Sequence, residues 1–151
     1  MNYLLSFLIA TNLLFTEKDF SIKDHKSLND SIIKYIETNP NKSLDYGFEI
    51  LKLADLSNPN RELVSTYNLI GQILTNKKLY AEALSYFSEA LKAFKLVENG
   101  RFDHEKKINQ PPWVLINISN LYYAIGEIED AKLKVNEAKT NFLLYEDQRK
   151  R

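Results

Sequence analysis

Apolar residues along this chain recur at intervals of three and four positions. Two clear runs are Leu28, Ile32, Ile33 and Ile36, and Leu44, Phe48, Leu51 and Leu56. This spacing places side chains on one side of an α-helix, whereas the alternation typical of strands is almost absent. The pattern predicts an all-α fold with helices near residues 25–38, 41–56, 60–76, 79–98, 112–125 and 127–147.

Asparagine and proline mark several of the predicted helix starts. The segments "TNPN" at 38–41 and "SNPN" at 57–60 each offer an asparagine that can cap a helix, and a proline that is tolerated in a first turn. The connection at 98–113 contains Gly100 as a helix stop and a proline pair that predicts the next helix start. The connection is either a solvated link or a segment that overhangs a binding surface.

Two segments in the second half of the chain repeat each other. In "YNLIGQIL" (67–74) and "LINISNLY" (115–122), large apolar residues coincide at the first, fourth and eighth positions, and a small residue coincides at the fifth. The interval from Tyr67 to Ala83 equals the interval from Leu115 to Ala131. Equal internal spacing predicts two helix pairs of equal geometry.

This pattern resembles the tetratricopeptide repeat. The middle unit carries the resemblance through Tyr67, Ile70, Gly71, Leu74, Ala83, Phe87 and Ala90, and the last unit through Leu115, Ile118, Ser119, Tyr122, Gly126, Ala131, Val135 and Ala138. A first unit, "KSLDYGFEILKLA", has Ser43 and Gly47 where small residues can pack, with Ile50 in place of the final alanine. The units lie near 25–56, 60–98 and 112–147, within a repeat domain at 17–151.

The resemblance implies a right-handed α-α superhelix of about three antiparallel helix hairpins, and a non-catalytic scaffold that binds a protein or peptide. In that family the first helix of each pair lines the concave face. The corresponding residues are Ser65, Asn68, Gln72, Thr75, Trp113, Ile116, Asn120 and Tyr123. Gln72 and Asn120 hold equivalent places, and amides can pair with the backbone of an extended peptide.

Two further features bear on the predicted ligand. Trp113 is interpreted either as a ligand contact or as a cap over a hairpin junction. Members of the family that clamp a C-terminal carboxylate use Lys and Arg at the inward places, and this chain has neither there. That class of partner is therefore disfavoured.

Charge and composition exclude other functions. Twenty basic and twenty acidic side chains balance, which argues against a nucleic-acid binder. The chain has no cysteine, no glycine-rich phosphate loop and no zinc-protease motif. His25 and His104 are interpreted as surface residues, and the consecutive Asp103, His104 and Glu105 are not expected to converge on one metal ion. We expect no enzyme activity, no cofactor and no metal.

The ends of the chain leave alternatives open. The apolar segment 1–16 predicts either a signal peptide or membrane anchor, or an additional packing helix. A signal would make the protein exported or periplasmic, and otherwise it would be cytoplasmic; membrane association is expected only with an anchor. The last repeat is expected to leave an open face, which predicts either a fragment of a longer protein or a contact of the third hairpin with another molecule, a homodimer being one such contact. The chain also resembles the N-terminal repeat region of bacterial signalling proteins, so the alternative function is a sensory input module or a fragment of such a regulator.

Alanines at helical spacing allow the two helices of a hairpin to approach closely. Ala83→Leu should overpack the middle hairpin and lower its free energy of unfolding by about 1–3 kcal/mol. Thermal denaturation measures this effect. A variant as stable as the parent would contradict the prediction.

Overall fold

In a computed structural model, residues 22–98 and 110–149 are described, and their regular structure is entirely α-helical. The helices are α2 (Ile22–Tyr35), α3 (Pro40–Leu53), α4 (Arg61–Asn76), α5 (Tyr80–Glu98), α6 (Pro112–Ile125) and α7 (Ile128–Arg149). The predicted all-α class is confirmed for these residues, and the helix ends lie close to the predicted ones. Segment 1–16 and Gly100 lie outside the described residues.

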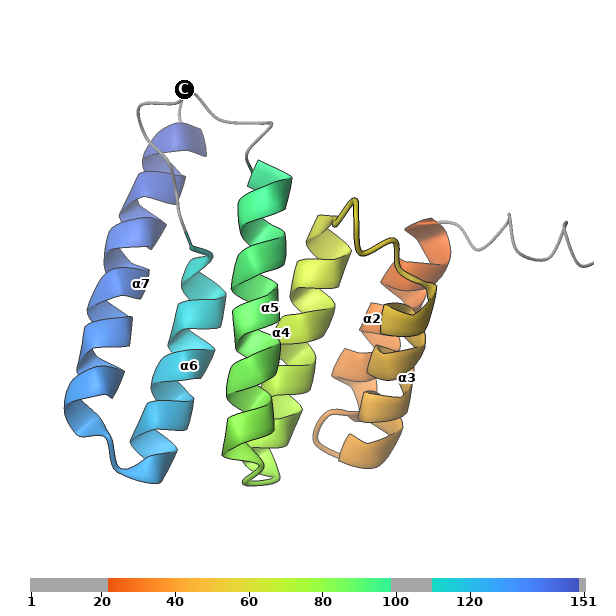
Figure 1. The fold of residues 1–151 in the computed structure, drawn as a ribbon, viewed down its shortest axis with the longest axis horizontal. Helices are drawn as coiled ribbons and strands as arrows, with labels where there is room; N and C mark the ends of the chain where they lie inside the picture. The colour runs from red at the N-terminus through yellow and green to blue at the C-terminus, as the bar shows by residue number, and fades with distance from the viewer. Residues whose placement is uncertain (1–21, 99–109, 150–151) are drawn as a thin grey trace, which may run out of the picture.

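The helices form three consecutive pairs that stand side by side (Figure 1). The closest packing is within the pairs α2–α3, α4–α5 and α6–α7, whose connections are short. Between pairs, α2 contacts α4, α4 contacts α6, and each second helix contacts the next first helix, as α3 does with α4 and α5 with α6. The first helices therefore run as a continuous row through the described structure.

Local signals in the sequence set the helix starts. The Asn39 side chain accepts a hydrogen bond from the Lys42 backbone N–H at 3.1 Å, and the Asn60 side chain accepts one from Leu63 at 2.8 Å. Both caps that "TNPN" and "SNPN" predicted are thus confirmed. Pro112 lies in the first turn of α6, where its missing N–H costs little, so the predicted start at the proline pair is also confirmed.

The turns inside the second and third hairpins have the same geometry. Lys78 (φ 61°) and Gly126 (φ 89°) adopt the left-handed conformation. In each turn the N–H of the next residue donates a hydrogen bond back to the first helix: Leu79 to the carbonyl of Leu74, and Glu127 to the carbonyl of Tyr122. Glycine adopts this conformation without strain, whereas lysine does so rarely. Lys78 and Gly126 are also equivalent positions of the repeat in the sequence, so the two lines of evidence agree.

The first hairpin turns in a different way. The Asn39 N–H bonds to the carbonyl of Tyr35, which is a shorter return than in the other two turns. The Tyr35 ring stacks on Tyr46 with centroids 6.0 Å apart, and the Lys42 ammonium lies 4.1 Å from the Tyr35 centroid. This turn is shorter by one position than the turns of the other two hairpins. We align Ser43 and Gly47 of α3 with Ala83 and Phe87 of α5. Ile32 of α2 then aligns with Gly71 of α4.

In this alignment, each hairpin places a small residue opposite a larger one. In the second hairpin a Cβ added to Gly71 of α4 would lie 2.5 Å from the Phe87 ring of α5. In the first hairpin the sizes are exchanged, since Ile32 takes the place of Gly71 and Gly47 takes the place of Phe87. A Cβ on Gly47 would lie 3.7 Å from Ile32 and 2.8 Å from Ile70 of the neighbouring pair.

Hydroxyl groups support the same alignment. The Ser43 Oγ donates to the Ile32 carbonyl at 2.8 Å, and the Ser119 Oγ donates to the Ala131 carbonyl at 2.9 Å. In the alignment, Ile32 corresponds to Ser119 and Ser43 to Ala131. The donor lies on the second helix in the first hairpin and on the first helix in the third hairpin. Each buried hydroxyl has a hydrogen-bond partner at the point where the helices are closest.

One core runs through all three pairs. Its fully buried side chains include Ile32 and Ile50 of the first pair, Ile70, Ile73, Phe87 and Phe94 of the second, and Val114 and Leu121 of the third. Ala83 and Ala90 are also fully buried, and Ala131 and Ala138 nearly so. The alanines lie where the sequence predicted close contact between helices.

Buried amides link the first helices to one another. Asn29 of α2 accepts a hydrogen bond from the Thr66 hydroxyl of α4 at 2.9 Å and donates to the Glu62 carbonyl at 3.2 Å. Asn68 of α4 holds the place equivalent to Asn29, and it accepts a hydrogen bond from Asn117 of α6 at 2.9 Å. Since an unpaired buried amide is costly, these bonds favour one register between neighbouring first helices.

The size exchange predicts a non-additive pair of substitutions. Gly71→Ser should collide with the Phe87 ring and Phe87→Val should leave a cavity, each lowering the free energy of unfolding by about 1–3 kcal/mol. The double variant reproduces the serine–valine combination of the third hairpin. The free energy of unfolding that the double variant loses should be smaller than the sum of the two single losses by about 0.5–3 kcal/mol, as measured by urea denaturation. Strict additivity would mean that the two residues do not contact each other.

Candidate binding surface

The eight predicted site residues lie on two neighbouring helices. Ser65, Asn68, Gln72 and Thr75 recur along α4, and Trp113, Ile116, Asn120 and Tyr123 recur along α6 at the same spacing. Both are first helices of their pairs, and they contact each other. The structure thus brings the two sets onto adjacent helices.

The α4 set is mostly covered. The Asn68 side chain is 8% exposed, and its oxygen is occupied by Asn117 of α6. The Thr75 hydroxyl donates to the Gly71 carbonyl at 2.9 Å within its own helix. Ser65 and Gln72 are half-buried. On α4, Asn68 therefore connects two helices, and the more accessible members of this set are the other three.

The α6 set is exposed. Ile116 and Asn120 lie on the surface, and Tyr123 is 71% exposed, the largest fraction among the exposed large apolar or aromatic side chains of the described residues. Trp113 packs edge-on against Phe94 of α5, with centroids 6.0 Å apart and ring planes at 84°. Trp113 thus caps the junction between α5 and α6. Part of its side chain is exposed, and its contact with a ligand stays a prediction.

The surface extends onto α2 through a residue that the sequence reasoning missed. When Ile32 is aligned with Gly71, Ile33 of α2 holds the place of Gln72 and Asn120, and its side chain is exposed. The signal was the apolar pair Ile32–Ile33, in which the first residue fills the small-residue place and the second lies on the surface. The shorter first turn shifted this register by one position. Equivalent places on the three first helices thus carry Ile33, Gln72 and Asn120.

The chemistry of this surface is uncharged. Its side chains are amides, hydroxyls, alkyl groups and aromatic rings, without a carboxylate, amine, guanidinium or imidazole among the eight predicted residues and Ile33. Amides donate and accept hydrogen bonds, and tyrosine and tryptophan combine flat apolar area with a polar group. The arrangement suits an extended chain whose backbone bonds to amides and whose side chains contact the rings.

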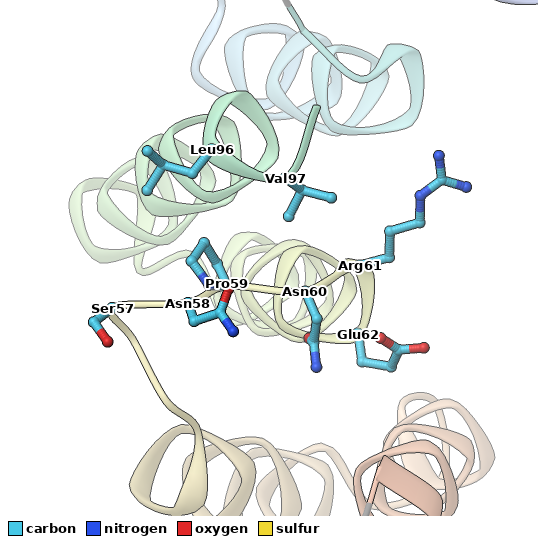
Figure 2. A pocket seen from close by; sticks show the side chains of 8 residues that line it. All are labelled: Ser57, Asn58, Pro59, Asn60, Arg61, Glu62, Leu96 and Val97. Atoms are coloured by element: carbon cyan, nitrogen blue, oxygen red, sulfur yellow. The ribbon is translucent and has the colours of Figure 1, made fainter. Parts of the chain in front are cut away.

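A cavity of about 500 Å³ lies elsewhere, between the α3–α4 connection and the end of α5. Leu96 and Val97 of α5 line it together with the segment from Ser57 to Asn60, and Figure 2 shows the Val97 side chain pointing toward that segment. Asp55 shapes this connection by accepting hydrogen bonds from the Ser57 hydroxyl at 2.6 Å and its N–H at 3.0 Å, which lower the pKa of Asp55. Asn60 is occupied as the α4 cap, and the adjacent Arg61 and Glu62 have opposite charges. The sequence reasoning did not single out this cavity.

The described ranges contain neither a metal cluster nor a membrane-spanning helix. Within residues 22–98 and 110–149, no group of three or more His, Cys, Asp or Glu side chains is placed to hold a metal ion. In the same ranges no helix is long and apolar enough to cross a bilayer. Asp103, His104 and Glu105, and the side chain of His25, lie outside the part of the chain that the structure describes.

Comparison with known proteins finds no relative: no family model, curated protein or solved structure matches this chain. The resemblance to the tetratricopeptide repeat therefore rests on the residues of this chain, and its functional interpretation on the surface that α2, α4 and α6 present.

Proposed function

We propose that the chain is a tetratricopeptide-like right-handed superhelix of three hairpins, whose row of first helices binds an extended peptide or partner segment without catalysis. The observation that carries the proposal is the exposed run Ile116, Asn120 and Tyr123 on α6, next to Gln72 on α4. The other members of the surface are Ile33, Ser65, Thr75 and Trp113.

Support for the repeat comes from contacts that recur. The turns at Lys78 and Gly126 have the same left-handed geometry, and contacts between the two helices of each hairpin recur at equivalent residues. First helices contact first helices from pair to pair. A unit with these contacts, stacked at regular steps, generates an array with a continuous surface along its first helices.

Support for a peptide ligand comes from the exposed apolar and amide groups. Tyr123, Ile116 and Ile33 leave apolar area in water on one row of helices, and large exposed residues in a row mark interaction surfaces. Aromatic residues are enriched among those that dominate binding energy. Gln72 and Asn120 supply hydrogen bonds that a peptide backbone can match without a fixed sequence.

The proposal assigns no catalytic step and no cofactor to this surface. General acid–base or nucleophilic catalysis requires an ionisable or activated group within hydrogen-bond reach of the substrate. The hydroxyls of Ser65 and Thr75 belong to a set without any basic partner. The alternative function, a sensory input module of a signalling regulator, would use the same row of helices and stays a prediction.

A peptide selection with matched variants tests the proposal. Linear peptides selected from a random phage-displayed library on the full chain should lose affinity by about tenfold for Ile116→Ala and for Tyr123→Ala, because each removes exposed contact area. Leu84→Ala on α5 is the matched control, since Leu84 is 39% exposed and Ile116 is 41% exposed. Fluorescence anisotropy measures the affinities.

The control should change affinity by less than about twofold. Peptides that respond equally to Leu84→Ala, or that respond to neither substitution on α6, would place binding on another surface and contradict the proposal. Circular dichroism of each variant confirms that the helices remain folded.

A further inference from the structure

The outer side of α7 corresponds to a side of α5 that is covered. When the last two hairpins are aligned, Val135 and Phe142 of α7 take the places of Phe87 and Phe94 of α5. Phe94 is 2% exposed because Trp113 of α6 packs against it, whereas Phe142 is 53% exposed. Val135 is also exposed while Phe87 is fully buried. No described helix lies over α7 in the way that α6 lies over α5.

Two lysines distinguish this side of α7 from its counterpart. Lys132 and Lys139 take the places of Leu84 and Leu91 on α5, and both lysines are exposed. Lys132 pairs with Glu129 at 2.7 Å, but both side chains are well exposed, so the pair contributes little. Lys139 forms no ion pair within the described residues. The result is an apolar row flanked by two cations.

We define the lysine-flanked stripe as Ile128, Lys132, Val135, Lys139 and Phe142. Their positions recur at intervals of three and four, so they share one side of α7. Ala131 and Ala138, on the adjoining side, are buried against the rest of the protein. The stripe is therefore the free side of a helix whose other side is already packed.

A second copy fits this stripe poorly. In a two-fold antiparallel pairing centred on Val135, Lys132 of one molecule would lie beside Lys139 of the other, twice, and like charges at that distance repel. A head-to-tail contact would set the stripe against Ser27, Asp30 and Lys34 of α2, which are exposed and offer no apolar row. The two-fold pairing is thus opposed by the lysines of the two copies.

We propose that the lysine-flanked stripe binds an amphipathic helix of a partner protein that carries an apolar row flanked by acidic residues. The apolar row would cover Ile128, Val135 and Phe142, in the way that Trp113 of α6 packs against Phe94, the equivalent of Phe142. Acidic side chains would pair with Lys132 and Lys139, which stand where α5 has Leu84 and Leu91. This binding is independent of the surface on α4 and α6.

Two synthetic helical peptides test the proposal on the full chain. They share one leucine and tryptophan row, and carry either glutamates or lysines beside it. By fluorescence anisotropy at low salt, the glutamate peptide should bind at least about tenfold more tightly, because electrostatic complementarity sets the preference. The double variant Lys132→Glu/Lys139→Glu should reverse that preference.

A matched pair on α7 tests the location. Phe142→Ser should weaken binding of the glutamate peptide by about tenfold or more. Leu133→Ser should leave it unchanged, because Leu133 is equally exposed, at 53%, but lies on another side of the same helix. Ile116→Ala, which tests the α6 surface, should also leave this affinity unchanged.

Several results would overturn the proposal. These are absence of binding, equal affinity for the two peptides, or equal loss with Phe142→Ser and Leu133→Ser. Light scattering adds another: a dimer of the parent chain that Phe142→Ser converts to a monomer would show that a second copy occupies the stripe.

Discussion

The close approach of two antiparallel helices at a small residue is the contact on which the rest of this structure depends. The Phe87 ring lies against Gly71, where even a methyl group would have no room. In the first hairpin the sizes are exchanged: a Cβ on Gly47 would meet Ile32 at 3.7 Å and would collide with Ile70 of α4 at 2.8 Å. Because interiors are close-packed, the sum of the two side chains matters more than which helix carries the larger one. The three pairs can therefore share one geometry while differing in sequence.

Buried amides connect neighbouring pairs. Asn29 and Asn68 tie each first helix to the next, and the core passes through all three pairs without a break. The row of first helices then leaves an uncharged surface that ends in Ile116, Asn120 and Tyr123. The last second helix, α7, has no successor among the described residues, and it has Lys132 and Lys139 where α5 has Leu84 and Leu91. The first helices and the outer side of α7 thus differ in chemistry.

Much of this could be predicted from the sequence, and the failures have physical causes. Helices and caps were accessible because apolar spacing and the asparagine–proline pairs act locally. The correspondence between the second and third hairpins was accessible because their turns are equal. The correspondence of the first hairpin was not accessible, because its turn is shorter by one position and its small and large residues are exchanged. For this reason the place of Ile33 on the surface was missed. The burial of Asn68 depends on Asn117, which is distant in the sequence, and no local pattern reports such a contact.

The central claim is that the first and second hairpins close on the same contact with the sizes exchanged. A nuclear Overhauser experiment on the protein in solution tests it most directly. The account predicts cross-peaks between the Gly71 α-protons and the Phe87 ring, and between the Gly47 α-protons and the Ile32 methyl groups. A cross-peak at Gly71 with none between Gly47 and Ile32 would show that the first hairpin packs in another register, and would contradict the alignment that places Ile33 beside Gln72 and Asn120.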